Sequence, residues 1–288
     1  MKLGYSQNFL RNPDLIEKLL NSSLIKSDDT VLEIGAGNGI ITAVLVKRCK
    51  LVIAVEIDKN LVVRLRQKFG QSRNVKVCEA NFLTFPLPKD EYSIFANIPF
   101  AITADIIRKI TKIDTAPVVS YLVVQKEAAQ KFSGCPYGKE TLSSVLNKPW
   151  FDFSITHEFL RNDFVPAPRV DIVLLKITKL EKPLVDPKQM GLYNDFVTYG
   201  FTSFRPTLRS GYKHIISNTQ FSKLAKDLGF DIDANPRDLV FEQWLRMFAF
   251  FVRGIDEKKQ QLVRGSLEKL NKQQEGLEKI HRTRIIRR

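Results

Sequence analysis

The sequence predicts an α/β fold with a parallel, doubly wound sheet, because short β-rich runs alternate with amphipathic helical patterns over its first 178 residues. Helical periodicity recurs at residues 40–48, 61–69 and 101–111. The seven predicted strands are 31–34, 51–57, 75–78, 93–96, 118–124, 155–159 and 172–177. Because ligands of such sheets bind at the carboxyl ends of the strands, we expect the functional residues there.

Composition favours a polyanionic partner and excludes several classes of protein. The 288 residues include 45 Lys and Arg against 31 Asp and Glu, a formal net charge of +14, which favours nucleic-acid binding over a merely basic surface. Three widely separated cysteines, Cys49, Cys78 and Cys135, form no metal-ligand pattern, so we expect no metal site. The N-terminus lacks an apolar signal run, and no segment approaches the roughly 18 apolar residues of a membrane helix. A cytoplasmic protein without a membrane partner is therefore expected.

The alternating pattern ends near residue 178. Residues 179–188 contain two prolines and several charges, which is typical of a linker, and residues 190–252 have helical periodicity. We therefore expect an α/β domain at 1–178, a small helical domain at 190–252, and a basic tail at 255–288. Four arginines lie in the last eight residues and fit either an arm for RNA phosphates or a solvated tail: Arg282, Arg284, Arg287 and Arg288.

A glycine-rich loop follows the first predicted strand, in the stretch TVLEIGAGNGIIT at 30–42. Glycine accepts positive φ and lets a ligand approach the backbone closely, so we assign the loop to a cofactor. A dinucleotide loop would read GxGxxG, but here Ile40 occupies the third glycine's position, and nothing argues for a pyrophosphate. The loop residues assigned to cofactor binding are Gly35, Ala36, Gly37 and Gly39.

The second strand ends in the stretch AVEID at 54–58. A carboxylate at this place can accept hydrogen bonds from both ribose hydroxyls of a nucleoside, a role that we assign to Glu56, with Ile57 beside it. Asp58 suits the N-cap of the next helix, and Glu33 is expected to orient the glycine loop and not to act in catalysis. The strand, the loop and the carboxylate, in this order, predict a nucleoside cofactor.

The fourth strand leads into Asn97, Ile98, Pro99 and Phe100. The N6 amino group of adenine has its lone pair delocalised into the ring, and the Asn97 side-chain oxygen and the Ile98 carbonyl can accept its two hydrogens, which localises that lone pair. Pro99 makes the turn rigid, and Phe100 offers a face for an extruded base, a contact worth about 1 to 3 kcal/mol. The four residues would otherwise be only a turn between strand and helix, but their position after a nucleoside loop favours catalysis.

These motifs resemble those of the ribosomal RNA adenine N6-methyltransferase superfamily, in particular its erythromycin-resistance (Erm) branch. The likeness covers nearly the whole chain up to about residue 250. Besides the glycine loop and the residues at 97–100, it rests on four stretches: SQNFL at 6–10, FVPAPRVD at 164–171, FTSFR at 201–205 and QWL at 243–245.

The resemblance implies a Rossmann-like, seven-stranded S-adenosylmethionine-dependent methyltransferase domain and a small C-terminal helical domain. It further implies transfer of one or two methyl groups to a single adenine of 23S ribosomal RNA, which gives macrolide, lincosamide and streptogramin B resistance. The enzyme would act as a monomer on naked or partly assembled RNA.

The resemblance also assigns residues. Gln7 and Asn8 would line the cofactor pocket, together with Phe82 and with Asn97, which serves both sites. Phe164 would be a second aromatic beside the target base or, alternatively, a core anchor before a proline-rich turn. Many relatives carry an aspartate after the third strand that accepts the amino group of the cofactor adenine. Here Asn81 offers an uncharged oxygen, which implies weaker cofactor binding.

Three other functions remain open. A small-subunit (16S) ribosomal RNA dimethyltransferase of the same superfamily usually carries Leu-Pro-Tyr, whereas this chain has Ile98, Pro99 and Phe100. DNA adenine methyltransferases usually carry a proline at the position of Ile98. A non-catalytic RNA-binding or transcription factor could keep the fold, but the intact Asn97 and Glu56 argue against it. Methyl transfer to 23S and 16S transcripts distinguishes these functions.

Overall fold

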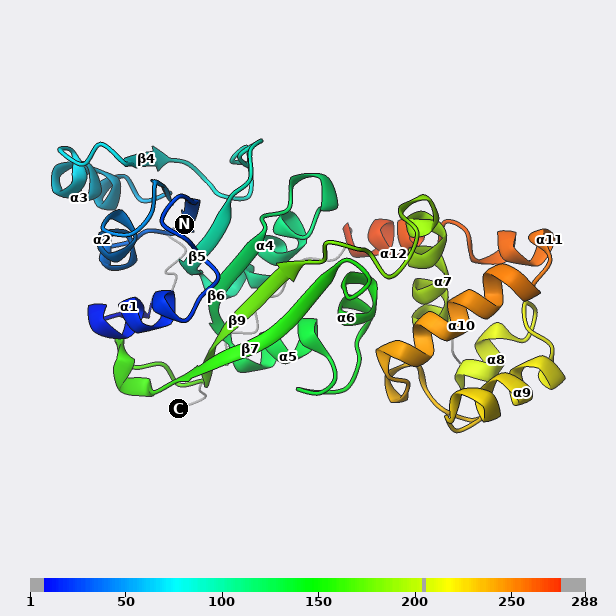
Figure 1. The fold of residues 1–288 in the computed structure, drawn as a ribbon. Helices are drawn as coiled ribbons and strands as arrows, with labels where there is room; N and C mark the ends of the chain where they lie inside the picture. Colours follow the sequence, from blue (N-terminus) through cyan, green and yellow to red (C-terminus); the bar gives the residue numbers. More distant parts are fainter. Residues whose placement is uncertain (1–7, 204–205, 276–288) are drawn as a thin grey trace. The chain divides into compact units, whose positions relative to one another are not determined.

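A computed structural model describes residues 8–203 and 206–275 (Figure 1). This part of the chain forms two compact units. The first unit contains residues 8–129 and 151–181, and the second contains residues 130–150 and 182–275. The segment 130–150, which the sequence pattern attributes to the α/β domain, thus groups with the C-terminal helices.

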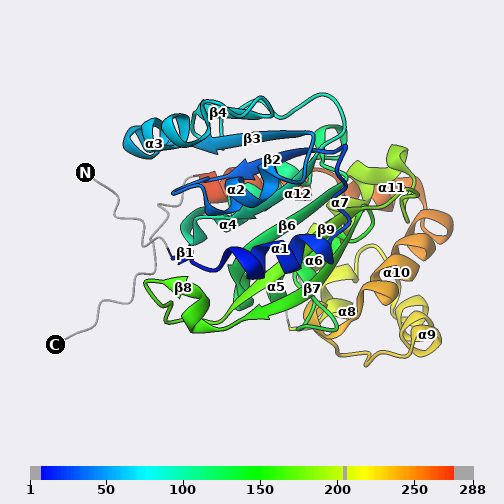
Figure 2. The ribbon, with the colours of Figure 1, turned by 60° about the vertical axis from the view of Figure 1, so that its left-hand side comes forward.

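A seven-stranded sheet forms the centre of the first unit, as predicted (Figure 2). The order of its strands is β4-β3-β2-β5-β6-β9-β7, so the order in which strands are added to the sheet reverses at β2, which lies between β3 and β5. Ligands of doubly wound sheets bind at such a point. The strands are β2 (Thr30–Ile34), β3 (Leu51–Glu56), β4 (Val75–Glu79), β5 (Ser93–Asn97), β6 (Val119–Gln125), β7 (Phe151–Phe159) and β9 (Ile172–Lys179).

The sheet is not wholly parallel, which corrects the prediction from the sequence. Strands β2 to β6 pair in parallel, but β9 runs antiparallel to both β6 and β7. Only residues 160–171 separate β7 from β9, and they contain no α-helix. The crossover connection between parallel neighbours usually contains a helix, and this connection contains none, which fits an antiparallel pair.

Helices cover the sheet of the first unit. One core cluster joins α1 and α2 to one face of the sheet through Leu20, Leu45 and Phe95, and a second cluster joins α3 to the same face through Leu65. Asp58 caps α3, as predicted, by accepting hydrogen bonds from the N–H groups of Asn60 and Leu61. The helices are α1 (Pro13–Asn21), α2 (Ile40–Val46), α3 (Lys59–Phe69), α4 (Thr103–Ile110) and α5 (Lys126–Ser133), the last of which crosses into the second unit.

The described chain begins with a strap across the first unit. We define this N-terminal strap as residues 8–11. Its strand β1 (Phe9–Leu10) pairs antiparallel with β8 (Phe164–Val165), and the Arg11 N–H donates to the Asp163 carbonyl at 3.0 Å. The strap therefore joins residues 8–11 to the connection between β7 and β9.

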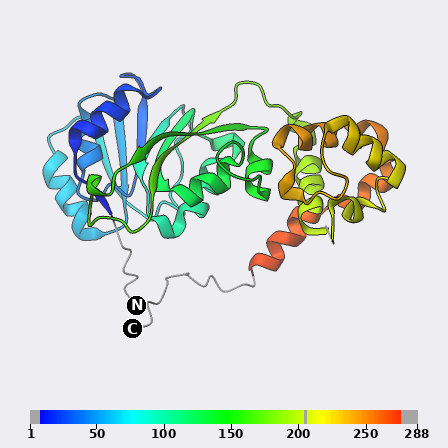
Figure 3. The same ribbon diagram turned by 90° about the horizontal axis from the view of Figure 1, so that it is seen from below.

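The second unit is helical (Figure 3). Its core contains fully buried aromatic side chains such as Tyr193, Phe196 and Trp244. The Tyr193 hydroxyl donates to the Val145 carbonyl at 2.8 Å, which ties the segment 130–150 to this core. The helices are α6 (Leu142–Asn147), α7 (Met190–Ser203), α8 (Leu208–Tyr212), α9 (Asn218–Leu228), α10 (Phe241–Gly254), α11 (Glu257–Gln260) and α12 (Ser266–Glu275).

The segment after α10 is part of this unit as far as α12. The Asp195 carboxylate on α7 accepts hydrogen bonds from the N–H groups of Gly265 and Leu267, at 2.9 and 3.0 Å, and Val263 is fully buried. The four arginines of the predicted basic tail lie outside the described residues. In the ranges that the structure describes, no helix is long and apolar enough to span a bilayer.

Candidate active site

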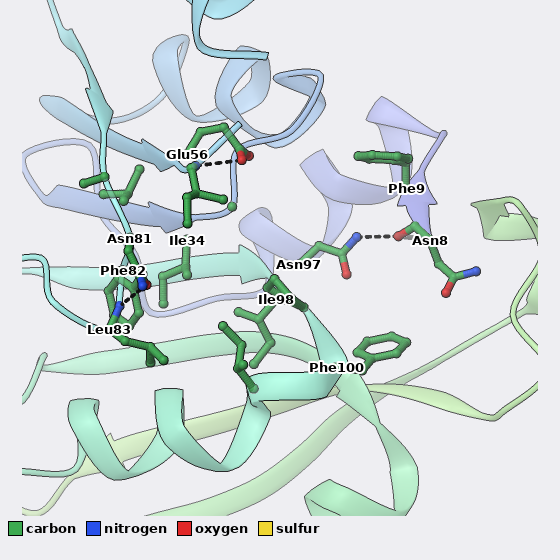
Figure 4. Close-up of a pocket in the computed structure, with 16 residues that line it drawn as sticks. Asn8, Phe9, Ile34, Glu56, Asn81, Phe82, Leu83, Asn97, Ile98 and Phe100 are labelled. Atoms are coloured by element: carbon green, nitrogen blue, oxygen red, sulfur yellow. Dashed lines mark hydrogen bonds between the residues drawn. The ribbon is translucent and has the colours of Figure 1, made fainter. Parts of the chain in front are cut away.

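A cavity opens at the carboxyl ends of β2, β3 and β5, at the point where the strand order reverses (Figure 4). All of its lining residues belong to the first unit. The cavity therefore lies at the edge of the sheet where the sequence predicts the ligand. The predicted site residues that line it are Asn8, Gly35, Glu56, Ile57, Asn81, Phe82, Asn97, Ile98, Pro99 and Phe100.

The glycine loop turns sharply between β2 and α2. Gly37 has a φ of +55°, and a Cβ at this position would lie 2.9 Å from a ring carbon of Phe9. Gly39 has a φ of +73°, and its Cβ would lie 2.7 Å from Leu65 and 2.8 Å from Phe69. Only glycine adopts this backbone without strain and leaves room for these three side chains. Gly35 lines the cavity. The other predicted loop residues, Ala36, Gly37 and Gly39, shape the loop but are not among the residues that line the cavity.

Glu56 holds that loop. Its carboxylate is 3% exposed and accepts three hydrogen bonds, from the N–H of Gly37 at 2.9 Å, of Ile57 at 2.8 Å and of Asp58 at 3.0 Å. A carboxylate offers roughly four acceptor positions, so the backbone already uses most of its capacity. One position remains for a ligand hydroxyl, where the sequence suggested contacts to two.

A second loop, Asn81–Phe85, borders the cavity after β4. The Asn81 side-chain oxygen accepts a hydrogen bond from the Leu83 N–H at 2.9 Å, which closes a tight turn, while the Phe82 side chain is buried against the cavity. The oxygen keeps one acceptor position, because an amide carbonyl has two lone pairs. Asn81 can thus still accept from an amino group while it shapes its own loop.

Asn97 ends β5 and is half-buried beside the cavity. Its side-chain amide donates from Nδ2 to the main-chain carbonyl of Asn8 at 2.7 Å. That bond fixes the orientation of the amide, and Oδ1 accepts no hydrogen bond from the described residues. Figure 4 shows this oxygen pointing away from Asn8, toward the side of Phe100. The site therefore presents an oriented acceptor without a partner, an arrangement suited to an amino group.

The residues after Asn97 lead into a short 3-10 turn, Phe100–Ile102, which precedes α4. Ile98 is 2% exposed and anchors the turn in the core. Pro99 has a φ of −62°, which its ring fixes. The ring of Phe100 is half-buried and borders the cavity, where its face can receive an aromatic ligand.

Phe164 does not line this cavity. Its side chain is 2% exposed, packs edge-to-face on Phe159 with ring centroids 5.4 Å apart, and belongs to the core cluster beneath α1. The pairing of β8 with β1 turns the ring inward beside Leu10. The structure thus gives Phe164 the position of a core anchor, which is the second of the two roles that the sequence leaves open.

Asn8 joins the strap to the site at two points. Its carbonyl orients Asn97, and its own side-chain Nδ2 donates to the Pro166 carbonyl at 2.7 Å. Its neighbour Gln7, which the resemblance places in the cofactor pocket, lies outside the described residues.

Glu33 lies beneath the glycine loop and outside the cavity. It is 2% exposed, and its Oε2 accepts a hydrogen bond from the Thr42 hydroxyl of α2 at 2.6 Å. Burial raises the pKa of Glu33 from 4.5 to about 8, although the Thr42 hydrogen bonds oppose the shift. Because Glu33 links β2 to α2 on both sides of the loop, it supports the loop and does not face a ligand.

Six further residues line the cavity without having been predicted as site residues: Phe9, Ile34, Val55, Ala80, Leu83 and Ile102. Each lies within two residues of a predicted site residue, so closeness in sequence to those residues was the signal that could have identified them. Their side chains are apolar, and no chemical motif distinguishes them. Within residues 8–203 and 206–275, no group of three or more His, Cys, Asp or Glu residues could hold a metal ion.

The fold and the cavity together define an S-adenosylmethionine-dependent methyltransferase, with a doubly wound sheet, a glycine loop after its first strand and a carboxylate after the next. Residues 1–253 match the model of the ribosomal RNA adenine dimethylase family. The chain belongs to this family, and it is a ribosomal RNA adenine N6-methyltransferase.

Individual relatives give the same result. The chain is 32% identical over 255 residues to an rRNA adenine N-6-methyltransferase of Bacteroides fragilis. The alignment covers 88% of this chain and 94% of that protein. It is 31% identical to ribosomal RNA small subunit methyltransferase A of Mycoplasmopsis pulmonis, over 86% of this chain and 97% of that protein. Among solved structures, 23S rRNA methyltransferase ErmE superposes with a TM-score of 0.79 at 27% identity, over 85% of this chain and 100% of ErmE. The similarity supports the Erm-like branch that the motifs suggested.

Proposed function

We propose that this enzyme methylates N6 of a single adenine in 23S ribosomal RNA and thereby confers macrolide, lincosamide and streptogramin B resistance. The main support for transfer to an amino group is the orientation of the Asn97 side chain. Its amide nitrogen is bound to the Asn8 carbonyl, and its oxygen has no hydrogen-bond partner among the described residues. Support for the 23S substrate comes from the similarity to ErmE over most of the chain, and from Ile98 and Phe100 in place of the leucine and tyrosine of the small-subunit enzymes.

The target adenine would enter the cavity as an extruded base. The ring of Phe100 would stack on it, while Asn97 Oδ1 and the Ile98 carbonyl accept the two N6 hydrogens and localise the nitrogen lone pair. Bound S-adenosylmethionine would supply the electrophilic sulfonium methyl group. As the carbon–nitrogen bond forms, the carbon–sulfur bond breaks and S-adenosylhomocysteine is released. The methylated nitrogen is acidic enough to lose its proton to water, so no side chain is needed as a general base.

The cofactor would occupy the part of the cavity between the glycine loop and the Asn81–Phe85 loop. Glu56 would use its remaining acceptor position for a ribose hydroxyl, and Asn81 would accept from the amino group of the cofactor adenine. Ile57, which is 60% exposed at the cavity although it is apolar, would pack on a cofactor ring. Gly35 and Asn8 would border the methionine portion.

The RNA backbone would contact the positively charged surface of the protein, which carries a net charge of +14. The helical domain predicted from the sequence, residues 190–252, would provide part of this RNA-binding surface, and a monomer would act on naked or partly assembled RNA. Phosphate contacts predict an affinity that falls steeply with rising salt concentration.

Transfer of tritiated methyl groups to naked RNA tests the proposal. We expect label on a 23S transcript and none on a 16S transcript or on assembled small subunits, with a primer-extension stop at one adenine. Asn97→Ala should abolish transfer, whereas the control Asn60→Ala, an exposed asparagine on α3, should leave it unchanged. Full activity of Asn97→Ala would contradict the proposed role of this oxygen.

A second substrate is supported by one specific observation, the 31% identity to the small-subunit methyltransferase of Mycoplasmopsis pulmonis. Label on two adjacent adenines of assembled small subunits, with none on 23S RNA, would favour that function and exclude the resistance phenotype.

A further inference from the structure

Lys109 lies in the last turn of α4, and its ammonium group reaches the loop that borders the cavity after β4. Its Nζ donates to the main-chain carbonyls of Phe82 at 2.6 Å, of Leu83 at 3.1 Å and of Phe85. It also lies 4.8 Å from the centre of the Phe82 ring, within the range of a cation–π contact. An ammonium has three N–H donors, and all three are used on one loop.

Without this ammonium the loop would be strained electrostatically. Three carbonyl oxygens converge on one point, and the negative ends of their dipoles repel each other unless a cation lies between them. The side chain of Lys109 is half-buried, and burial lowers its pKa, as does the neighbouring charge of Lys112. The contacts with the carbonyls therefore replace water that the ammonium has partly lost.

The loop held in this way carries cavity residues. Asn81, Phe82 and Leu83 line the cavity, and the carbonyls of Phe82 and Leu83 are two of the three that Lys109 binds. Helix α4 begins directly after the turn at Phe100, so Lys109 also connects this loop to the element that carries the target-base residues.

We propose that Lys109 is a positioning residue for cofactor binding, which shapes the adenine end of the S-adenosylmethionine site by holding the carbonyls of the Asn81–Phe85 loop. This inference rests on the proposed placement of the cofactor in this cavity and does not depend on which RNA is methylated. Lys109 is not among the residues that line the cavity, so its loss should weaken cofactor binding more than it slows the methyl transfer itself.

Calorimetric titration with S-adenosylhomocysteine, in the absence of RNA, tests the inference. Lys109→Met keeps the length of the side chain and removes the charge, and it should raise the Kd about tenfold, which corresponds to about 1.4 kcal/mol of binding free energy. Lys109→Arg, which keeps a cationic donor, should recover most of the affinity. The control Lys112→Met removes a neighbouring exposed charge and should leave the Kd unchanged.

Steady-state kinetics provides the second readout. For Lys109→Met we expect the KM for S-adenosylmethionine to rise with the Kd, while kcat at saturating cofactor stays within about twofold of the unmodified enzyme. If Lys109→Met does not purify as a folded protein, Lys109→Gln is titrated in its place.

Three results would overturn the inference. The first is an unchanged Kd in the neutral variants, and the second is an equal rise in Lys112→Met, which would indicate a general charge effect. The third is a fall in kcat with an unchanged KM, which would place the role of Lys109 at the target base. Because the titration contains no RNA, failure of the 23S assignment leaves its outcome intact. Absence of binding to the unmodified protein would instead reject the cofactor site and this inference with it.

Discussion

Replacement of Glu56 by glutamine tests how the glycine loop is held. In the structure the buried carboxylate accepts hydrogen bonds from the N–H groups of Gly37, Ile57 and Asp58. Glutamine keeps one oxygen, which can still serve the Ile57 and Asp58 amides. Its NH₂ group would then face the Gly37 N–H, so that two donors meet where a hydrogen bond of 2.9 Å had been.

The magnitude follows from this single lost contact. A hydrogen bond to a charged group contributes about 1.5–3 kcal/mol, and a buried N–H left without an acceptor costs a similar amount. We expect Glu56→Gln to lower the free energy of unfolding by about 2 kcal/mol and to raise the Kd for S-adenosylhomocysteine at least about tenfold, since 1.4 kcal/mol corresponds to tenfold in affinity.

Urea denaturation and calorimetric titration measure the two effects. The matched control is Glu79→Gln, because Glu79 is the register partner of Glu56 on β4 but is exposed. The control should change neither quantity. If Glu56→Gln binds S-adenosylhomocysteine as tightly as the unmodified protein and unfolds at the same urea concentration, the carboxylate does not organise the loop.

Three further predictions concern pH, the target base and the tail. Because the pKa of Glu33 is about 8 in the folded protein, against 4.5 for an ordinary carboxyl group, unfolding releases a proton between these pH values and stability falls as pH rises through them, by on the order of 4 kcal/mol. Glu33→Gln should remove this decline in urea denaturation at about pH 5 and about pH 8, and parallel curves for the two proteins would contradict it. Phe100→Ala should reduce methyl transfer much more than S-adenosylhomocysteine affinity, whereas equal losses would mean a structural role. Deletion of residues 276–288, which include four arginines, should weaken RNA binding and make its affinity depend less on salt concentration. An unchanged salt dependence would exclude phosphate contacts by these arginines. A cut after Gly254 would be a poor test, because it also removes the buried Val263.

Much of the fold could be predicted because the relevant signals are local. Buried strands such as β5 and β6 appear as continuous apolar runs, and the cap of α3 requires only Asp58 and the residues that follow it. The direction of β9 could not be predicted in this way. It depends on which strands become neighbours, and a short apolar run has the same composition in either direction.

The candidate site shows the same division. Glu56 and Asn97 could be selected from the sequence because each polar side chain directly ends an apolar strand. The sequence could not decide whether Phe164 stacks on the target base or anchors the core, since an aromatic residue before prolines suits both roles equally well. The role of Lys109 was also hidden, because its partners are main-chain carbonyls 24 to 27 residues earlier, and a backbone carbonyl has no signature in a sequence.

The contact between Asn97 and the strap has a consequence for mutagenesis. Since the acceptor is the main-chain carbonyl of residue 8, every amino acid placed there supplies the same oxygen. An alanine scan of the strap would therefore leave this bond in place and underestimate the importance of the segment. Inserting or deleting one residue between Asn8 and Pro13 would instead move the oxygen by one peptide unit and release the amide. Spacing in this segment should consequently tolerate far less change than side-chain identity does.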